Sequence, residues 1–331
     1  MAASKFGSQF AARFAHSSYA DGSWLPAQIE PVATLSLHPA AHVLHYASTC
    51  FEGLKAYRHA DGSVHLFRLD RHVARMQRSA ELLCLPVPPA DHLASMIAGL
   101  VDKVRDEVPD YPSALYLRPV LVGVDPNIGS AAHPTRDALL YVLASPVGSY
   151  FAKGASTLRL LVETEHMRTT PEFGEVKTGG NYAAGLRRVV DARAAHGVDQ
   201  VLFCPGGDVQ ETAAANFLLL NDKKVVTKRL DGSILPGITR ASVLKLAGQA
   251  GYQVEERDIE VAEMLEWVKT GEAALSGTAA VLTPVGALVH DGREHPVGDG
   301  QAGRNTQRLC EVLMAIHGGR AADTHGWLTR V

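Results

Sequence analysis

Apolar residues recur along the first half of this chain at helical spacing, three and four positions apart. One such stripe consists of Val73, Met76, Ala80 and Leu83, and Asp70 stands where the N-cap of this helix is expected. A second helix should start near Asp91, with its stripe on Leu93, Met96, Ile97, Leu100 and Val104. Apolar runs at 64–67, 115–124 and 138–144 predict strands. The first half is therefore predicted to mix strands with helices.

The second half shows the same mixture after a break. The pattern predicts strands at 158–163, 200–204 and 253–259, and helices at 181–195 and 239–250. Turns at 205–208 and 221–222 flank further strands and indicate hairpins. The segment SPVGSYFAKG at 145–154 interrupts the pattern with proline and glycine. We therefore expect a small α/β domain over 1–145, a linker at 146–154 and a larger domain over 155–331.

Length and charge narrow the possible partners. The chain has 331 residues, which agrees with two domains at about 150 residues each. Its formal net charge of −3 gives no strong positive field, which argues against nucleic acid and anionic lipid as partners. The longest apolar runs, such as 217–220, are far shorter than the roughly 20 residues that cross a bilayer. We expect neither a nucleic-acid nor a membrane partner.

Cysteine use and the N-terminal sequence bear on the compartment. Four cysteines lie far apart without a CxxC pair, which favours a reducing cytoplasm. The first twenty residues are basic and contain serines but no acid, and three phenylalanines stand at helical spacing, as in some transit peptides. No clear cleavage point follows them. We expect residues 1–20 to remain in a cytoplasmic protein.

Several common motifs of enzymes are missing from the sequence. One GxGxxG occurs at 298–303, but only 28 residues follow it, too few for a dinucleotide-binding unit. The chain has no GxxxxGK[ST], HExxH or GxSxG, and its 15 histidines show no metal-ligand spacing. Nicotinamide, phosphotransfer and zinc chemistry therefore lack support, and we expect no metal.

Two segments combine glycine with residues that could bind or react. In KTGGNY, 177–182, Lys177 precedes two glycines that open a helix, where a desolvated lysine can attack a carbonyl. The alternative for Lys177 is an ordinary solvated lysine. In LPGITR, 235–240, a Pro-Gly turn leads into a helix whose first N–H groups could bind phosphate. The alternative there is a plain capped helix.

Three further segments have candidate polar groups. SGTAA at 276–280 suits a backbone nest for an anion, or is a simple turn. ETAAAN at 211–216 places Glu211 among small residues, and a buried glutamate needs a cationic partner such as a protonated ring nitrogen. Arg75 and Arg118, in the run YLR, could equally face water. Taken singly, none of these segments decides a function.

Together these segments resemble the branched-chain aminotransferases, which are pyridoxal-phosphate enzymes of fold type IV. The resemblance covers nearly the whole chain, from Phe6 to Leu328, in the same order and spacing. It also includes His45-Tyr46, FEGLKAY at 51–57 and VGDGQAG at 297–303 before the last helix. The resemblance implies a two-domain α/β (α+β) fold with pyridoxal 5'-phosphate in the cleft between the domains.

The resemblance also implies roles for single residues around the cofactor. Lys177 would form the Schiff base and shuttle the proton between the substrate's α-carbon and the cofactor. Glu211 would hold the pyridine nitrogen protonated, and Tyr182 would hydrogen-bond the phenolic oxygen of the ring. The implied phosphate ligands are Arg75, Ile238, Thr239 and Thr278.

The implied reaction exchanges amino groups between L-leucine, L-isoleucine or L-valine and 2-oxoglutarate by a ping-pong mechanism. The α-carboxylate would bind Tyr116 and the amides of Thr278 and Ala279, and Arg118 would bind the side-chain carboxylate of glutamate. The implied wall of the aliphatic pocket consists of Tyr46, Phe51 and Tyr150. Partners would be these small molecules and a second copy of the chain, in a homodimer.

Two departures from the family pattern accompany the resemblance. Thr-Ala-Ala-Ala at 212–215 replaces one or two glycines, which predicts a tighter backbone, and 280–283 lacks the CxxC pair of animal members. A D-amino-acid transaminase or aminodeoxychorismate lyase of the same fold remains an alternative, against which Tyr116 and Arg118 argue. A noncatalytic phosphate-ligand-binding protein is a further alternative, disfavoured because Lys177 and Glu211 are both present.

Overall fold

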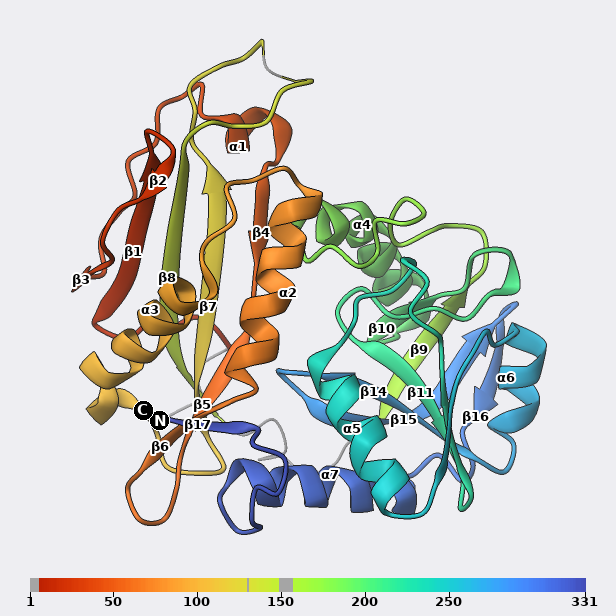
Figure 1. Ribbon diagram of the computed structural model, residues 1–331. Helices are drawn as coiled ribbons and strands as arrows, with labels where there is room; N and C mark the ends of the chain where they lie inside the picture. The colour runs from red at the N-terminus through yellow and green to blue at the C-terminus, as the bar shows by residue number, and fades with distance from the viewer. Residues whose placement is uncertain (1–5, 130, 149–156) are drawn as a thin grey trace. The chain divides into compact units, whose positions relative to one another are not determined.

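The chain divides into two compact units in the computed structural model, which describes residues 6–129, 131–148 and 157–331 (Figure 1). The first unit holds the described residues of 1–149 together with 176–179 and 316–331. The second holds those of 150–175 and 180–315. This differs from the expected single stretch on each side of a linker, because two later segments return to the first unit. The expected linker lies outside the described residues from position 149 to 154.

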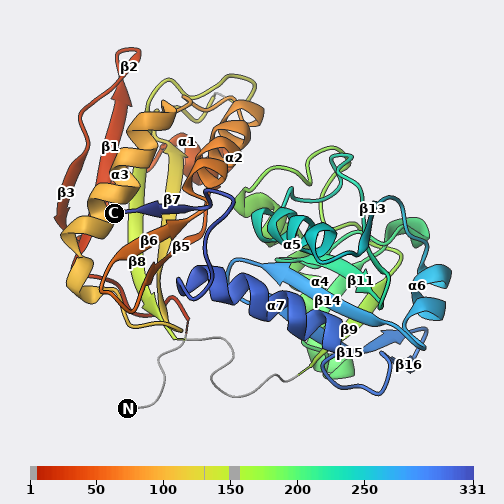
Figure 2. The ribbon, with the colours of Figure 1, turned by 60° about the horizontal axis from the view of Figure 1, so that its bottom comes forward.

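The first unit is built on an antiparallel sheet. Its described strands follow the order β17-β6-β5-β7-β8-β1-β2, with β3 beside β1 and β4 beside β7. The bounds are β1 Arg13–Ala20, β2 Ser23–Trp24, β3 Gln28–Pro31, β4 Thr49–Phe51, β5 Leu54–Arg58, β6 Val64–Phe67, β7 Ala114–Gly123, β8 Ala138–Val147 and β17 Leu328–Arg330. β17, near the C-terminus, pairs with β6, which explains why the last residues belong to this unit (Figure 2).

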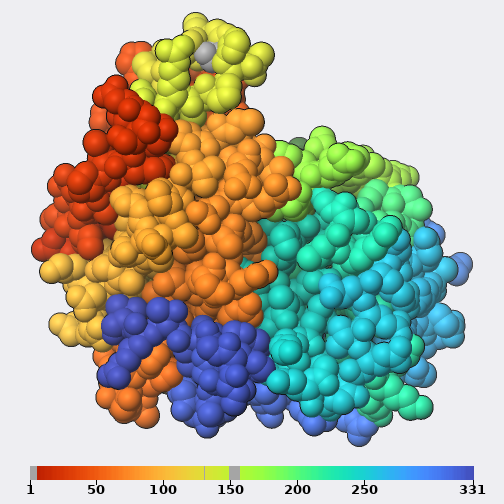
Figure 3. Space-filling model, viewed as in Figure 1, coloured from red at the N-terminus to blue at the C-terminus, as the bar shows by residue number. Residues whose placement is uncertain are grey.

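Two helices, α2 Leu69–Leu82 and α3 Ala90–Lys103, pack on one face of this sheet. The short helix α1 His42–Tyr46 lies at the end of β7, where His42 N–H donates to Asp125 O, and the 3-10 turn η1 Arg105–Glu107 follows α3. α2 and α3 lie in front of this sheet in Figure 1, and in the same view in Figure 3 their orange and yellow-orange atoms are at the surface of the first unit. Leu115, Leu117 and Leu121 of β7 point into the core with the stripes of both helices. Because side chains alternate along a strand, Tyr116 and Arg118 lie on the opposite face.

The two helices with predicted stripes are confirmed, with one correction at the start of α2. α2 begins at Leu69 and its N-cap residue is Arg68, with φ 52° and no side-chain cap. Asp70 is therefore not the cap that the sequence suggested. It lies in the first turn, where its negative charge interacts favourably with the helix dipole. α3 starts at Ala90, beside the predicted Asp91.

The second unit has a mixed sheet. Its described strands follow the order β10-β9-β15-β14-β11-β12-β13, with β16 beside β15. The bounds are β9 Leu158–Glu163, β10 Gln200–Phe203, β11 Asn216–Leu220, β12 Lys224–Thr227, β13 Gln253–Glu256, β14 Glu272–Gly277, β15 Val281–His290 and β16 Arg293–Pro296. β10 and β15 run parallel to β9, and β13 runs parallel to β12, whereas the other pairs are antiparallel.

Helices of the second unit make its parallel crossovers and cover its sheet. α4 Gly179–His196 joins β9 to β10, and α5 Ile238–Gln249 joins β12 to β13. α4 packs Val189 and Ala192 on Val201 and Phe203, whereas α6 Val261–Trp267 packs against the other core of the unit. The 3-10 turn η2 Pro205–Gly207 and α7 Arg304–His317 complete the elements. The α/β class expected from the sequence is confirmed.

The N-terminal segment contains a strand that the sequence pattern did not reveal. β1 pairs with β8 and buries Phe14 and Ala15. Phe6, Phe10 and Phe14 stand at helical spacing in the sequence, but Phe14 belongs to this strand. In the described part of the chain, no helix is both long and apolar enough to cross a membrane.

Candidate active site

Lys177 lies in the first unit, on the short segment just before α4. The backbone N–H of Lys177 donates to Ser79 Oγ at 3.1 Å, and its carbonyl accepts from Phe51 N–H at 3.0 Å. Thr178 adds a bond from its hydroxyl to the Thr49 carbonyl at 2.7 Å. α2 and β4 therefore hold the backbone of this lysine from two sides.

The side chain of Phe51 brings two cations together. Lys177 Nζ lies 4.9 Å from the centroid of the Phe51 ring, and Arg118 Cζ lies 4.6 Å from the same centroid. A cation over an aromatic face is stabilised by the ring quadrupole and partly shielded from water. The structure thus brings together three of the residues that the sequence singled out.

Arg118 and Tyr116 form a pair on the face of β7 away from the helices. Arg118 Nη2 donates to the Tyr116 hydroxyl at 3.0 Å, while the buried Arg118 Nε has no hydrogen-bond partner among the described residues. Phe6 packs edge-on against Tyr116, with ring centroids 5.0 Å apart. A buried donor without a partner is costly, which favours an acceptor supplied by a ligand.

Arg75 is not a solvated residue of α2, because it is paired with the buried Glu52. Its Nε and Nη2 donate to the two oxygens of Glu52 at 2.7 and 2.9 Å, and His72 Nδ1 lies 2.7 Å from Oε2. Burial opposes ionisation of Glu52, but Arg75 and His72 outweigh it, so the pKa of this carboxyl is lowered well below its usual range. Burial lowers the pKa of His72, which leaves its ring neutral at pH 7. Glu52 was not among the site residues expected from the sequence.

Glu211 lies in the second unit and is buried. Its Oε1 accepts from Leu235 N–H at 2.9 Å and pairs with Arg168 Nη2 at 2.7 Å, and its Oε2 accepts from Asn216 Nδ2 at 2.7 Å. Arg168 also donates to the Gly174 carbonyl at 3.0 Å. The expected cationic partner therefore includes an arginine of the chain itself. No motif had pointed to Arg168, which lies 43 positions from Glu211 (211 − 168).

The alanine-rich segment after Glu211 forms a turn closed by Thr212. The Thr212 hydroxyl accepts from Ala215 N–H at 3.1 Å, and Thr212 N–H donates to the Ala215 carbonyl at 3.0 Å. None of residues 212–215 adopts a positive φ. The turn therefore needs no residue with a positive φ, so alanine can stand where the resemblance leads us to expect glycine.

The N-terminus of α5 is arranged around Asn216. Asn216 Nδ2 donates to Leu235 O at 2.9 Å, so this side chain joins Glu211 to the segment that leads into the helix. A Cβ on Gly237, the N-cap residue, would lie 1.9 Å from Asn216 Oδ1, which only glycine avoids. The helix has no side-chain cap. Its first residues, Ile238 and Thr239, therefore present backbone donors suited to an anion.

The SGTAA segment lies next to this group. Ser276 of β14 is the register partner of Asn216 in β11, and Thr278 and Ala279 form the turn that follows β14. Ser276 Oγ is buried and has no hydrogen-bond partner among the residues described. An uncapped helix start beside an unsatisfied buried hydroxyl is a donor set that fits a phosphate group.

Three further predicted residues are Tyr182, Tyr46 and Tyr150. Tyr182 lies half-buried in the first turns of α4, one residue after Asn181, whose side chain donates to Phe173 O at 2.9 Å. Tyr46 donates its hydroxyl to Ile128 O, and its ring lies 4.8 Å from that of His42. Tyr150 lies outside the described residues.

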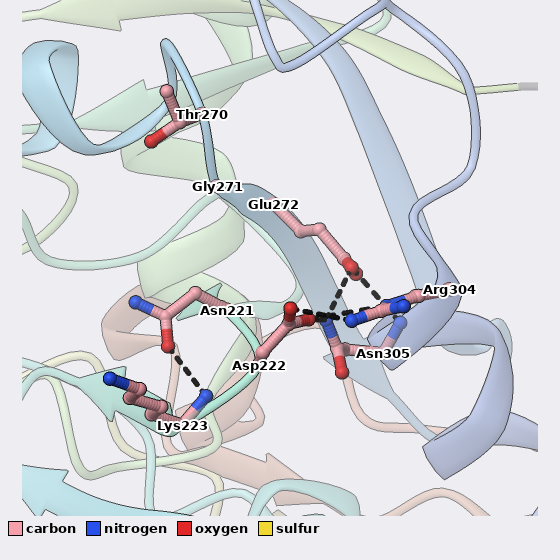
Figure 4. A pocket seen from close by; sticks show the side chains of 8 residues that line it. All are labelled: Asn221, Asp222, Lys223, Thr270, Gly271, Glu272, Arg304 and Asn305. Carbon is pink, nitrogen blue, oxygen red and sulfur yellow. Dashed lines mark hydrogen bonds and ion pairs between the residues drawn. The ribbon is translucent and has the colours of Figure 1, made fainter.

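A pocket of about 550 Å³ in the second unit is lined by Glu272, which lies next to the last glycine of the GxGxxG motif at 298–303 (Figure 4). Glu272 in its wall accepts from the N–H groups of Asn305 and Thr306 at 2.9 and 2.8 Å, and so caps α7. A Cβ on Gly303 would lie 2.0 Å from Glu272 Cδ. The last glycine of 298–303 therefore serves helix capping, not a nucleotide.

One group in the described residues has the composition of a metal site. Glu163, Glu165 and His166 bring ligand-type atoms within 4.8 Å of one another. Arg188 contacts His166 and lies 3.9 Å from Glu163 Oε2, so a cation of the chain already faces this group. We therefore assign no metal to it.

Comparison with known proteins gives a consistent set of similarities. A family model described as amino-transferase class IV matches residues 49–288. The chain is 40% identical over 329 residues to a branched-chain-amino-acid aminotransferase of Mycobacterium tuberculosis, covering 95% of this chain and 88% of that protein. It is 38% identical over 333 residues to a probable branched-chain-amino-acid aminotransferase of Streptomyces coelicolor, covering 98% and 91%.

A solved structure with the same fold contains a cofactor. The T.th. branched-chain amino acid aminotransferase with pyridoxamine 5'-phosphate has a TM-score of 0.80 and 28% identity, covering 97% of this chain and 99% of that one. The same enzyme has been solved with N-(5'-phosphopyridoxyl)-L-glutamate, at TM-score 0.79 and 28% identity, covering 96% and 98%. It has also been solved with 4-methylvaleric acid, at TM-score 0.78 and 27% identity, covering 96% and 98%.

Proposed function

This chain belongs to the class IV aminotransferases, and within them to the branched-chain-amino-acid aminotransferases. From that premise we propose that it exchanges amino groups between L-leucine, L-isoleucine or L-valine and 2-oxoglutarate. The observation that carries the proposal is the placement of Lys177 and Arg118 over the same Phe51 ring, next to Tyr116. This arrangement combines a reactive amine, a cation for a carboxylate and an apolar surface.

Enzymes of this family use pyridoxal phosphate, and the donor set of the second unit fits its phosphate. We propose that the backbone of Ile238 and Thr239, with Thr278, binds the phosphate, together with Arg75 of the first unit. We propose that Glu211 faces the ring nitrogen and Tyr182 the phenolic oxygen. Support for Glu211 comes from its burial and from the three groups that fix its carboxylate.

The bound cofactor would supply the carbonyl carbon that takes up the amino group and a ring that withdraws electrons from the substrate. Lys177 would carry the cofactor on Nζ and then move the proton at the substrate's α-carbon. The bonds of its backbone to Ser79 and Phe51 keep this amine in place between turnovers. Glu211 would keep a positive charge on the ring nitrogen throughout.

Arg118 would decide which substrate side chains the pocket accepts. For glutamate, the guanidinium binds the side-chain carboxylate, and its buried Nε gains the acceptor that it lacks. For leucine, the guanidinium stays stacked on Phe51, and the ring offers an apolar surface. The α-carboxylate would bind Tyr116 and the turn of Thr278 and Ala279. The T.th. enzyme, which has been solved with ligands of both kinds, supports this dual use.

Replacing Arg118 by glutamine tests the proposed function. We expect kcat/KM for L-glutamate and 2-oxoglutarate to fall about 10- to 100-fold, because only these dicarboxylates use the charge. The value for L-leucine should change less than about threefold. Steady-state kinetics with each substrate measures this difference. Arg293→Gln, an exposed residue of β16 with no assigned role, is the matched control and should change neither value. Equal losses for leucine and glutamate would contradict the dual pocket.

We also propose that the enzyme acts as a homodimer in the cytoplasm. The four cysteines form no disulfide, and three of them are buried, which suits a reducing compartment. Leu186 and Val190 lie one turn apart on α4 with 59% and 51% exposure, an apolar surface that a second copy would cover.

A further inference from the structure

The loop between β4 and β5 connects several groups of the proposed site. Phe51 lies beneath Lys177 and Arg118, Glu52 pairs with Arg75, and a Cβ on Gly53 would lie 1.9 Å from the Tyr116 hydroxyl. Three successive residues therefore contact the proposed amine, phosphate and carboxylate ligands of the first unit. Glu52 is the charged residue of the three, and no role follows for it from the proposed function.

Glu52 fixes the direction in which Arg75 points. The guanidinium is planar, and two of its three nitrogens bind the two carboxylate oxygens of Glu52. Fixing one edge of a planar group also fixes the plane and the direction of the opposite edge, which carries Nη1. A lone arginine side chain would sample many rotamers before it met a phosphate.

His72 fixes Glu52 in turn. Its Nδ1 lies 2.7 Å from Oε2, and both side chains are almost fully buried, at 2% and 1% exposure. Because the His72 ring is neutral, it adds a hydrogen bond without adding a charge. His72 and Arg75 lie three residues apart on α2, so one side of this helix faces the loop.

We propose that Glu52 is a positioning residue for the cofactor phosphate, acting through Arg75. This inference rests on the proposed function, because Arg75 serves as a phosphate ligand only if pyridoxal phosphate binds. Glu52 brings a negative charge near an anion, so its charge alone would weaken phosphate binding. Its benefit is the fixed geometry of Arg75. Loss of the charge would lower the Kd of pyridoxal 5'-phosphate, whereas loss of the fixed geometry would raise it.

The test compares cofactor affinity in Glu52→Gln and wild-type protein, each first freed of cofactor. We expect the Kd of pyridoxal 5'-phosphate to rise about 10-fold, because a glutamine amide cannot accept both guanidinium donors. The Kd of pyridoxal, which lacks the phosphate, should stay the same. Glu81→Gln, an exposed glutamate on the same helix, is the matched control and should change neither value.

A double-mutant cycle with Arg75→Gln separates positioning from general damage. In the Arg75→Gln background, Glu52→Gln should cause no further loss of pyridoxal 5'-phosphate affinity, because the residue through which it acts is gone. Additive losses would overturn the proposal, as would an unchanged or tighter Kd in Glu52→Gln alone. Wild-type protein that binds no pyridoxal 5'-phosphate would instead overturn the proposed function itself.

A second variant covers the case in which Glu52→Gln fails to fold. Glu52→Asp keeps the charge but withdraws the carboxylate by one methylene, so Arg75 must shift. We expect the same selective loss for pyridoxal 5'-phosphate over pyridoxal, with the melting temperature of the cofactor-free protein as a check on folding. Equal losses for both ligands would overturn the proposal.

Discussion

Lys177→Ala is expected to lower transamination of L-leucine by about 10⁴-fold or more. The change removes both the amine that would carry the cofactor and the group that would move the α-proton. Both roles depend on one Nζ, which lies over Phe51 while the backbone is held by Ser79 and Phe51. Because one amine would supply both functions, we expect that the substitution is not rescued from within the protein.

Borohydride reduction followed by intact-protein mass spectrometry checks this expectation. Wild-type protein incubated with pyridoxal 5'-phosphate should gain the mass of one reduced cofactor, and peptide mapping should place it on Lys177. Lys177→Ala should gain none at that peptide. Lys269→Ala, whose exposed side chain pairs with Glu266, is the control and should behave as wild type. Label at another lysine, or more than about 1% residual activity, would be against the assigned role.

Glu211→Gln is expected to slow the half-reaction with L-leucine by about 10²- to 10³-fold. A neutral amide cannot hold a positive charge on the ring nitrogen, so the ring withdraws electrons less strongly when the α-proton leaves. Cofactor affinity should change much less, because the proposed phosphate ligands are separate residues. Three donors, from Asn216, Leu235 and Arg168, fix the carboxylate. The glutamine oxygen can still accept from Leu235 and Arg168, but its NH2 group would face the Asn216 amide, so the melting temperature of the variant is the check on folding.

Single-turnover kinetics at saturating L-leucine measures the slowed step directly. Glu165→Gln, an exposed residue of the same unit, is the matched control and should leave the rate unchanged. A Glu211→Gln rate within a few-fold of wild type would show that this carboxylate does not serve the ring nitrogen. A large rise in the cofactor Kd with an unchanged rate would point to a binding role only.

Local sequence patterns predicted those parts of the fold that depend on neighbours along the chain. The stripes of α2 and α3 and the strands β6 and β9 were located within about one residue, because each buries one regular face. The pairing of β1 with β8 was not predictable in this way. Its partner lies more than one hundred residues later, and only tertiary contact shows which strands meet.

The same limit explains which site residues were found. Lys177 and Gly237 lie in segments whose glycines indicate an unusual backbone conformation, so a local pattern is enough to predict them as candidates. Glu52 and Arg168 matter through partners 23 and 43 positions away, and no local pattern distinguishes them from surface charges. Arg75 was identified by resemblance alone, since its helix position gives no sign that a buried carboxylate binds it.

The discontinuous first unit follows from the same kind of contact. β17 pairs with β6 at the edge of the sheet, and the segment at 176–179 is hydrogen-bonded to α2 and β4. Neither the break in the pattern at 145–154 nor a change of composition shows that 176–179 and 316–331 belong to the first unit. A single linker, as expected from the sequence, does not account for the return of 176–179 and 316–331 to the first unit.

We propose that one pocket binds an aliphatic substrate and a dicarboxylic substrate in alternate half-reactions, and the stoichiometry of the two half-reactions can show this. Purified protein is loaded with pyridoxal 5'-phosphate, freed of excess cofactor and given L-leucine alone. We predict one equivalent of 4-methyl-2-oxopentanoate per subunit, then one equivalent of glutamate when 2-oxoglutarate replaces the leucine, and no pyruvate from D-alanine. The proposal would be contradicted if 4-methyl-2-oxopentanoate formed only when L-leucine and 2-oxoglutarate were present together. It would also be contradicted if the protein converted D-alanine faster than L-leucine.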